Sequence, residues 1–157
     1  MRPHDMGTLF DEVAARHTHT TVHLDRPFDI APAGPAPADR SHGALGDDGF
    51  GQGVDYTVPE LAGLVREAAG WLHAVGARRG DRVAVVKRNH YDYDLLACAA
   101  VRIGAVPALL SGHLSDDALE TLLKRLDPAV LVTDRVPPAG VAGRVLALGE
   151  PFAGAPR

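Results

Sequence analysis

The sequence predicts an α/β protein in which helices cover both faces of a mainly parallel β-sheet. One observation is the continuous apolar run from Val83 to Val86, because a strand buried on both faces shows unbroken rather than alternating hydrophobicity. Another is that helical and strand patterns alternate from Tyr56 onward. Such alternation specifies parallel strands joined by right-handed crossovers. We therefore expect a three-layer, Rossmann-like sheet with an N-terminal antiparallel hairpin at its edge.

The first half of this alternation carries clear local signals. Residues 57–60 (TVPE) form a capping box with proline in the first helical turn, and Gly76 supplies the stop at the other end of that helix. A strand over 82–86 follows. An apolar helix over 92–103 and a second short strand over 106–110 come next.

The remaining elements are shorter. A helix with one apolar face is expected over 9–16, ahead of the alternation. Ser115 is placed to cap another helix, which ends at Asp127 before a proline. The apolar run 129–133 then predicts a third strand, and 145–148 a further possible one. The two strands would extend the parallel sheet.

Residues 17–24 alternate polar with β-branched or apolar residues, which is typical of a strand. As a strand, this segment would place His17, His19 and His23 on one face. Three imidazoles could bind a metal, but no carboxylate or cysteine is arranged to complete a tetrahedral site. The exposed face of an edge strand is the simpler interpretation. With a partner strand near Val54, the segment would form a hairpin that adds either an antiparallel edge to the central sheet or a small side sheet.

The 157 residues make up one domain's worth of chain, so we expect a single unit over 1–157. Within it, residues 30–53 are dominated by Ala, Pro and Gly and are expected to form a long mobile loop. The tail over 135–157 has a similar composition and is expected to be weakly structured.

Composition narrows the classes of partner. With 46% hydrophobic and 23% charged residues the chain is close to the average of soluble globular proteins. The net charge of -4, with both signs interleaved, offers no basic patch for nucleic acid and no polybasic membrane signal. The longest apolar stretch, 95–110, is interrupted and falls short of the roughly 20 residues of a membrane span. A small-molecule or protein partner is favoured.

The N-terminal residues and the single cysteine bear on the location of the protein and on its redox chemistry. The N-terminus lacks the apolar core of a signal peptide, so a cytoplasmic location is expected. The single cysteine, Cys98, excludes an internal disulfide and lies within the apolar helix, where a thiol usually behaves as a small buried hydrophobe.

Polar clusters follow two neighbouring strands of the predicted sheet, residues 87–90 after the first and 111–113 after the second. In open α/β sheets, ligands bind at the carboxyl ends of the strands. Asn89, His90 and Ser111 are therefore the candidate substrate-binding residues. No residue is identified as catalytic or as a metal ligand.

Structural roles compete with binding at this edge. Asn89 is a good N-cap for the following helix, which accounts for it without any ligand. Lys87 and His90 could face a ligand or simply water, and their turn context favours water.

Five stretches, taken together and in order, resemble the N-terminal subdomain of the adenylate-forming superfamily, which includes acyl-CoA synthetases, adenylation domains of non-ribosomal peptide synthetases and luciferases. The resemblance covers about residues 7–135. It rests on Asp55–Leu61 (DYTVPEL), Gly76–Val85 (GARRGDRVAV), Asn89, Arg102–Leu110 (RIGAVPALL) and Pro128–Asp134 (PAVLVTD).

This resemblance implies that full-length relatives use ATP and Mg²⁺ to turn a carboxylic acid into an acyl-adenylate, and then pass the acyl group to CoA or to a carrier protein. The family's ATP loop, a Ser/Thr/Gly-rich run ending in Pro-Lys-Gly, does not occur in this sequence. We therefore expect a portion truncated before the ATP loop that binds no cofactor and is inactive alone. The resemblance makes the edge around Asn89, His90 and Ser111 a contact region for substrate.

The chain would then be either a fragment or one half of a split enzyme. The alternative is a non-catalytic protein-interaction module that kept the scaffold and lost the chemistry. A dinucleotide-binding domain is disfavoured, because Gly80 precedes its strand whereas the G-x-G-x-x-G fingerprint follows one. An unpaired sheet edge would also favour self-association or binding to a complementing C-terminal portion.

Overall fold

A four-stranded parallel sheet forms the centre of the computed structural model. Its strand order is β4-β3-β5-β6, and all neighbouring strands pair in parallel, as predicted. The strands are β3 (Arg82–Lys87), β4 (Val106–Ser111), β5 (Val130–Thr133) and β6 (Arg144–Ala147). The structure describes residues 5–25, 28–29, 54–88, 91–138, 140–141 and 143–147.

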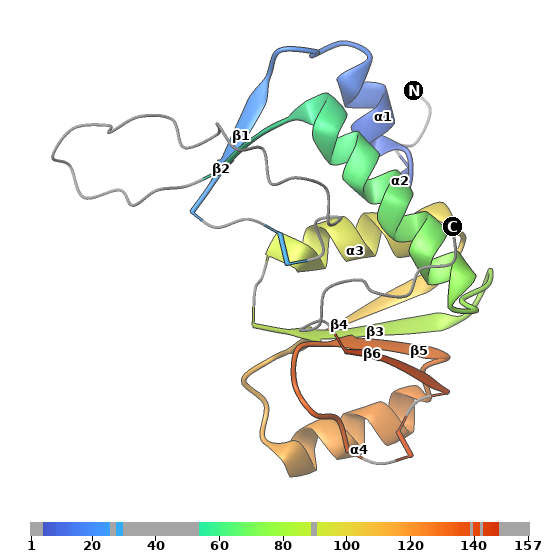
Figure 1. Ribbon diagram of the computed structural model, residues 1–157. Helices are drawn as coiled ribbons and strands as arrows, with labels where there is room; N and C mark the ends of the chain where they lie inside the picture. Colours follow the sequence, from blue (N-terminus) through green and yellow to red (C-terminus); the bar gives the residue numbers. More distant parts are fainter. Residues whose placement is uncertain are drawn as a thin grey trace, which may run out of the picture.

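Helices cover both faces of this sheet, which confirms the three-layer fold (Figure 1). α2 (Val58–Ala74) and α3 (Tyr91–Arg102) lie on one face, and α4 (Asp116–Leu126) lies on the other. Alternate residues of β3 supply the two cores. Val83 and Val85 pack with α2 and α3, whereas Ala84 and Val86 pack with leucines of α4. The continuous apolar run thus marks a strand buried on both sides.

The hairpin pairs β1 (Thr21–Leu24) with β2 (Val54–Thr57) in antiparallel register. It forms a separate two-stranded sheet, which is the side-sheet placement rather than an edge of the central sheet. β1 begins later than predicted, so His17 and His19 lie in the preceding turn and share no strand face with His23. Across the hairpin, His23 Nδ1 lies 2.7 Å from Asp55 Oδ1. In the described ranges, no group of three or more His, Cys, Asp or Glu is placed to hold a metal.

Local signals define the ends of α2 as predicted. Thr57 Oγ1 accepts a hydrogen bond from the Glu60 backbone N–H at 3.3 Å, and Glu60 Oε2 accepts one from the Thr57 N–H at 2.8 Å. Such a capping box stabilises a helix start by about 1 kcal/mol. At the other end, Gly76 has a φ of 106°, and the Ala77 N–H donates to the Leu72 carbonyl. This is a Schellman motif, which only a residue tolerant of left-handed φ completes without strain.

Charged contacts hold the N-terminal helix α1 (Leu9–Ala14), which has no fully buried residue. The Asp11 carboxylate pairs with Arg66 of α2 at 2.6 Å and with Arg102 of α3. Arg102 also donates to the Gly7 carbonyl at 2.8 Å. The hydrogen bond from Arg102 lowers the pKa of Asp11, although burial opposes it, and the positive charges of both arginines add to the effect.

The single cysteine behaves as expected from its position in the apolar helix. Cys98 is a free, buried thiol in α3. Burial raises its pKa, and the negative charge of Asp94 adds to that shift, so the thiol stays protonated and unreactive at neutral pH.

Several predictions fall outside the described residues. The loop expected over 30–53 lies there, as do Asn89, His90 and residues 148–157 of the tail. β6 corresponds to the further strand expected near 145–148. The single unit over 1–157 stays a prediction. No helix in the described part of the chain has the length and hydropathy needed to cross a membrane.

Candidate functional site

A hollow of about 370 Å³ lies at the carboxyl ends of β3 and β4, the edge that the sequence predicts for ligand binding. Ser111 ends β4 with an exposed side chain and lines this hollow. The other two predicted residues, Asn89 and His90, are outside the described ranges. The lining consists of Lys87, Arg88, Tyr93, Leu109, Leu110, Ser111, Gly112 and His113.

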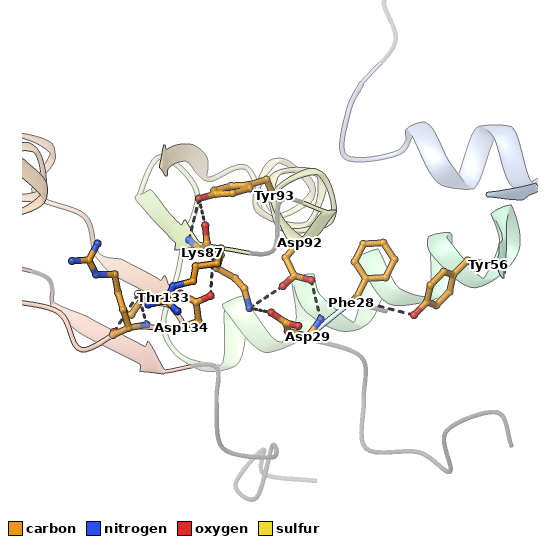
Figure 2. A network of polar contacts seen from close by, with 10 residues as sticks. Phe28, Asp29, Tyr56, Lys87, Asp92, Tyr93, Thr133 and Asp134 are labelled. Carbon is orange, nitrogen blue, oxygen red and sulfur yellow. Dashed lines mark hydrogen bonds and ion pairs between the residues drawn. The ribbon is translucent and has the colours of Figure 1, made fainter. Parts of the chain in front are cut away.

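The Tyr93 side chain joins the ends of β3 and β4 at the hollow, and Figure 2 shows its hydroxyl beside the Lys87 backbone. Its hydroxyl accepts a hydrogen bond from the Lys87 backbone N–H at 3.0 Å. The same hydroxyl lies 2.8 Å from the Lys87 carbonyl and 2.6 Å from the Leu110 carbonyl, and donates its one proton to either. Because Tyr93 belongs to the first turn of α3, that helix fixes the spacing of β3 and β4 at the candidate site.

Two close approaches tie further chain segments to the same edge. A Cβ on Gly112 would lie 2.4 Å from the Lys87 carbonyl oxygen, so only glycine allows this turn to pack on the end of β3. On the other side, Asp134 Oδ2 accepts a hydrogen bond from the Arg88 N–H at 2.9 Å. Arg135 donates to the Leu114 carbonyl at 2.8 Å and pairs with Asp116. The ends of β3, β4 and β5 are therefore held together.

Lys87 differs from the expectation of a solvent- or ligand-facing turn residue. It is the last residue of β3, and its side chain is 0% exposed. The reason is the strand alternation, which continues from Val83 and Val85 and directs Lys87 into the layer of α2 and α3. A buried ammonium group requires partners, because its transfer from water is costly.

Two carboxylates surround the Lys87 ammonium group (Figure 2). Nζ lies 2.8 Å from Asp92 Oδ2, on a side chain that is itself 0% exposed, and 2.8 Å from Asp29 Oδ2. The Asp29 backbone N–H also donates to Asp92 Oδ1 at 3.1 Å. We call Lys87, Asp92 and Asp29 the buried ion cluster, in which Lys87 and Asp92 are fully buried and the Asp29 side chain is 45% exposed. Sequence reasoning missed this cluster. A signal for Lys87 was available, because the side chains of a strand alternate in direction and Lys87 falls on the same face as Val83 and Val85.

The cluster has opposing electrostatic effects on its members. Burial lowers the pKa of Lys87, but hydrogen bonds and charge from Asp29 and Asp92 outweigh it and raise the pKa above its ordinary value. Burial raises the pKa of Asp92 to about 6, despite the opposing hydrogen bond and charge of Lys87. Lys87 is therefore a cation at neutral pH, whereas Asp92 takes up a proton as the pH falls below about 6.

The cluster also anchors the segment that follows β1. Phe28 packs on Tyr56 of β2 with ring centroids 5.0 Å apart and planes tilted by 57°. The Phe28 backbone N–H donates to the Tyr56 hydroxyl at 3.4 Å. With Asp29 bound to the cluster, these contacts attach the hairpin to the carboxyl edge of the central sheet.

The hollow offers polar contacts rather than an activated nucleophile. Ser111 Oγ accepts a hydrogen bond from the His113 backbone N–H at 3.2 Å. Within the described ranges, no histidine or carboxylate hydrogen-bonds to the Ser111 hydroxyl, so no base is placed to activate it. Lys87 Nζ is engaged by two carboxylates below the surface. The described side chains suit binding and orientation of a ligand.

Comparison with known proteins decides the family. A sequence model described as "AMP-binding enzyme" matches residues 36–150. The chain belongs to the AMP-binding enzyme family. This confirms the resemblance to adenylate-forming enzymes that the motifs indicated.

Relatives in this family are much longer than the chain. It is 41% identical over 142 residues to 3-amino-2-hydroxy-4-methoxybenzoate diazotase of Streptomyces cremeus, covering 90% of this chain and 22% of the diazotase. It is 32% identical over 88 residues to acetyl-coenzyme A synthetase of Streptomyces coelicolor, covering 56% of this chain and 13% of the synthetase. The chain thus spans less than a quarter of either relative.

Solved structures of AMP-binding enzymes share the fold. A fatty acyl CoA synthetase of Mycobacterium tuberculosis superposes with a TM-score of 0.67 at 17% identity, covering 91% of this chain and 26% of that one. The N-terminal subdomain of NpsA from Klebsiella oxytoca gives a TM-score of 0.64 at 18% identity, covering 96% and 34%. These likenesses place the chain's fold among the N-terminal subdomains of the family.

Breaking the buried ion cluster should destabilise the fold strongly. Lys87→Met leaves Asp92 buried without its cation, and we expect a loss of about 3–5 kcal/mol in the free energy of unfolding, measured with urea. Lys87→Met combined with Asp92→Asn removes the unpaired charge and should recover part of this loss.

The matched control is Lys124→Met, which removes an exposed lysine paired with Glu120 in α4. We expect a change within about 1 kcal/mol there, since exposed ion pairs contribute little. Equal losses for Lys87→Met and Lys124→Met, or a double variant less stable than Lys87→Met alone, would contradict this account of the cluster.

The raised pKa of Asp92 gives stability a definite pH dependence. Between the ordinary value of 3.8 and about 6, the folded chain binds more protons at Asp92 than the unfolded chain does. The Asp92 contribution to the free energy of unfolding should therefore be largest below pH 3.8, fall as the pH rises towards 6, and level off above it.

Urea unfolding of the native chain and of Asp92→Asn across this pH range measures the effect as a difference. The lowered pKa of Asp11 acts in the opposite direction but is present in both proteins and cancels. A native-minus-variant difference that grows with rising pH would show that Lys87, rather than burial, controls the carboxyl group.

Proposed function

We propose that the chain is the N-terminal portion of an ATP-dependent enzyme that activates a carboxylic acid as an acyl-adenylate and transfers the acyl group to the thiol of CoA or a carrier protein. The family match over residues 36–150 is the observation that carries this proposal. The acetyl-coenzyme A synthetase relative supports the thiol as acceptor. ATP and Mg²⁺ would be bound by the whole protein.

Within that enzyme, the chain would act as scaffold and as one wall of the substrate site. The hollow at the ends of β3 and β4 supports this role, with Ser111 as a contact for substrate together with Asn89 and His90. No residue of the chain is assigned a catalytic step, because the family's ATP loop does not occur in the sequence. A cytoplasmic location goes with this proposal.

A second candidate concerns the substrate class. The match to the diazotase covers 90% of the chain with 41% identity. The match to the acetyl-coenzyme A synthetase covers 56% of the chain with 32% identity. This difference favours an amino- and hydroxy-substituted benzoate over acetate as the acid handled by the whole protein.

The isolated 157-residue chain should be inactive. With MgATP and either acetate or 3-amino-2-hydroxy-4-methoxybenzoate, we expect no pyrophosphate release above the background with ATP alone, because the family's ATP loop does not occur in the sequence. Acetyl-coenzyme A synthetase of Streptomyces coelicolor with acetate serves as the positive control. Turnover by the isolated chain would overturn the assignment as a scaffold portion.

A chimera separates the enzyme portion from the non-catalytic module. Replacing the matching 22% of the Streptomyces cremeus diazotase by this chain should preserve diazotase activity if the chain is an equivalent N-terminal portion. A folded but inactive chimera would favour the interaction module instead.

We also propose that the chain self-associates or binds a complementing portion through the free edge of β4. Among the described strands, β4 pairs with β3 alone, and it exposes 53% of Val106 and 47% of Leu109. An unpaired apolar edge is a template for another strand.

Light scattering across a range of concentrations tests this edge. The mass of the native chain should rise with concentration, and Val106→Lys should shift it towards the monomer by placing a charge on the edge. Val136→Lys is the matched control, because Val136 is 91% exposed but lies outside the strands. A strictly monomeric native chain at high concentration would contradict the proposal.

A further inference from the structure

A second, apolar cavity lies away from the hollow, between the hairpin and the helices α1, α2 and α3. Its volume is about 130 Å³. Aromatic rings from three elements line it, Phe10 of α1, Phe28 after β1 and Tyr91 of α3. Val22 of β1 forms part of its wall and is 38% exposed, so the cavity is open to solvent beside the hairpin.

The first turn of α3 separates this cavity from the candidate functional site. Asp92 and Tyr93 contact Lys87 in the central sheet, whereas Tyr91 and Asp94 line the cavity. The two sites therefore use different faces of the same helical turn.

The size and lining of the cavity match one small ring or a short alkyl chain. An apolar cavity of roughly 150 Å³ in another protein stays free of water and binds benzene. Burial of a ligand here is favourable because it removes apolar surface of both ligand and cavity from water.

The charge of the cavity lining indicates which polar group the ligand would carry. Among the described residues that line the cavity, Asp94 alone is charged. Its side chain is exposed, and it forms no hydrogen bond or ion pair with other described residues. The nearby carboxylates of Asp29 and Asp92 are both already paired with Lys87. Among the described lining residues, exposed Asp94 therefore presents a negative charge next to aromatic rings, a combination that attracts cations.

We propose that this cavity is a binding site for a small apolar ammonium compound, with an aryl or alkyl group among Phe10, Phe28 and Val65 and the ammonium group against Asp94. The site requires neither ATP nor any residue of the hollow. It can be tested on the 157-residue chain whatever the outcome for the proposed function.

Three probes of similar size and different charge separate the contributions: benzylamine, benzyl alcohol and benzoate. Titrations followed by NMR chemical shifts should show saturable binding of benzylamine about five-fold tighter than that of benzyl alcohol, as expected for one exposed ion pair. Benzoate should bind weakest, because its charge repels Asp94.

Variants test each half of the site. Asp94→Asn should remove the preference for benzylamine over benzyl alcohol, whereas Asp117→Asn, which changes an acidic residue in the first turn of α4, should leave it unchanged. Val22→Trp fills the cavity from a partly exposed position in β1, and should weaken binding of benzylamine and benzyl alcohol at least ten-fold. Val65→Phe fills the cavity from α2 and should do the same if it folds.

Several results would overturn the proposal. These are the absence of saturable shifts with benzylamine, equal affinity for benzylamine and benzoate, a preference that survives Asp94→Asn, and unchanged binding in folded Val22→Trp.

Discussion

The buried ammonium group of Lys87 is the constraint on which the arrangement of the other segments depends. A cation with no exposed surface at the end of the central strand costs several kcal/mol unless anions meet it at hydrogen-bond distance. One anion, Asp92, belongs to α3, the helix that follows the same strand. The other, Asp29, belongs to the segment that follows β1 of the hairpin. The requirement to neutralise one charge therefore fixes three segments that lie apart in the sequence.

This fixation extends to the geometry of the candidate site. The turn that carries Asp92 also carries Tyr93, whose hydroxyl joins the ends of β3 and β4. Gly112 then packs against the Lys87 carbonyl on the other side. The hollow is thus formed by backbone held through side chains that lie below it, while exposed groups such as Ser111 are left for a ligand. Binding surfaces on strand ends are commonly positioned in this way by a rigid scaffold.

Local sequence signals predict the fold because most helices and strands carry their own start, stop or hydrophobic pattern. The capping box at Thr57 and Gly76 at the end of α2 act through neighbouring residues, so no tertiary information is needed. The buried ion cluster could not be found in the same way. A lysine after an apolar run marks the end of a strand in the sequence pattern. In the structure β3 extends through Lys87, and the alternating direction of its side chains turns Lys87 to the same face as Val83 and Val85. Its partner Asp29 lies beyond any local pattern, because only the folded chain brings it near β3.

The first turn of α3 links the two cavities of the molecule. Tyr91 and Asp94 line the apolar cavity, Asp92 binds Lys87, and Tyr93 binds the strand ends. These four residues share one turn of hydrogen-bonded backbone, so a displacement of that turn would move all of them. A group that displaced the turn from the cavity side would therefore stretch the contacts of Asp92 and Tyr93 on the sheet side. The free energy of the buried ion cluster opposes that displacement, because breaking it would leave a charge unpaired in the protein interior.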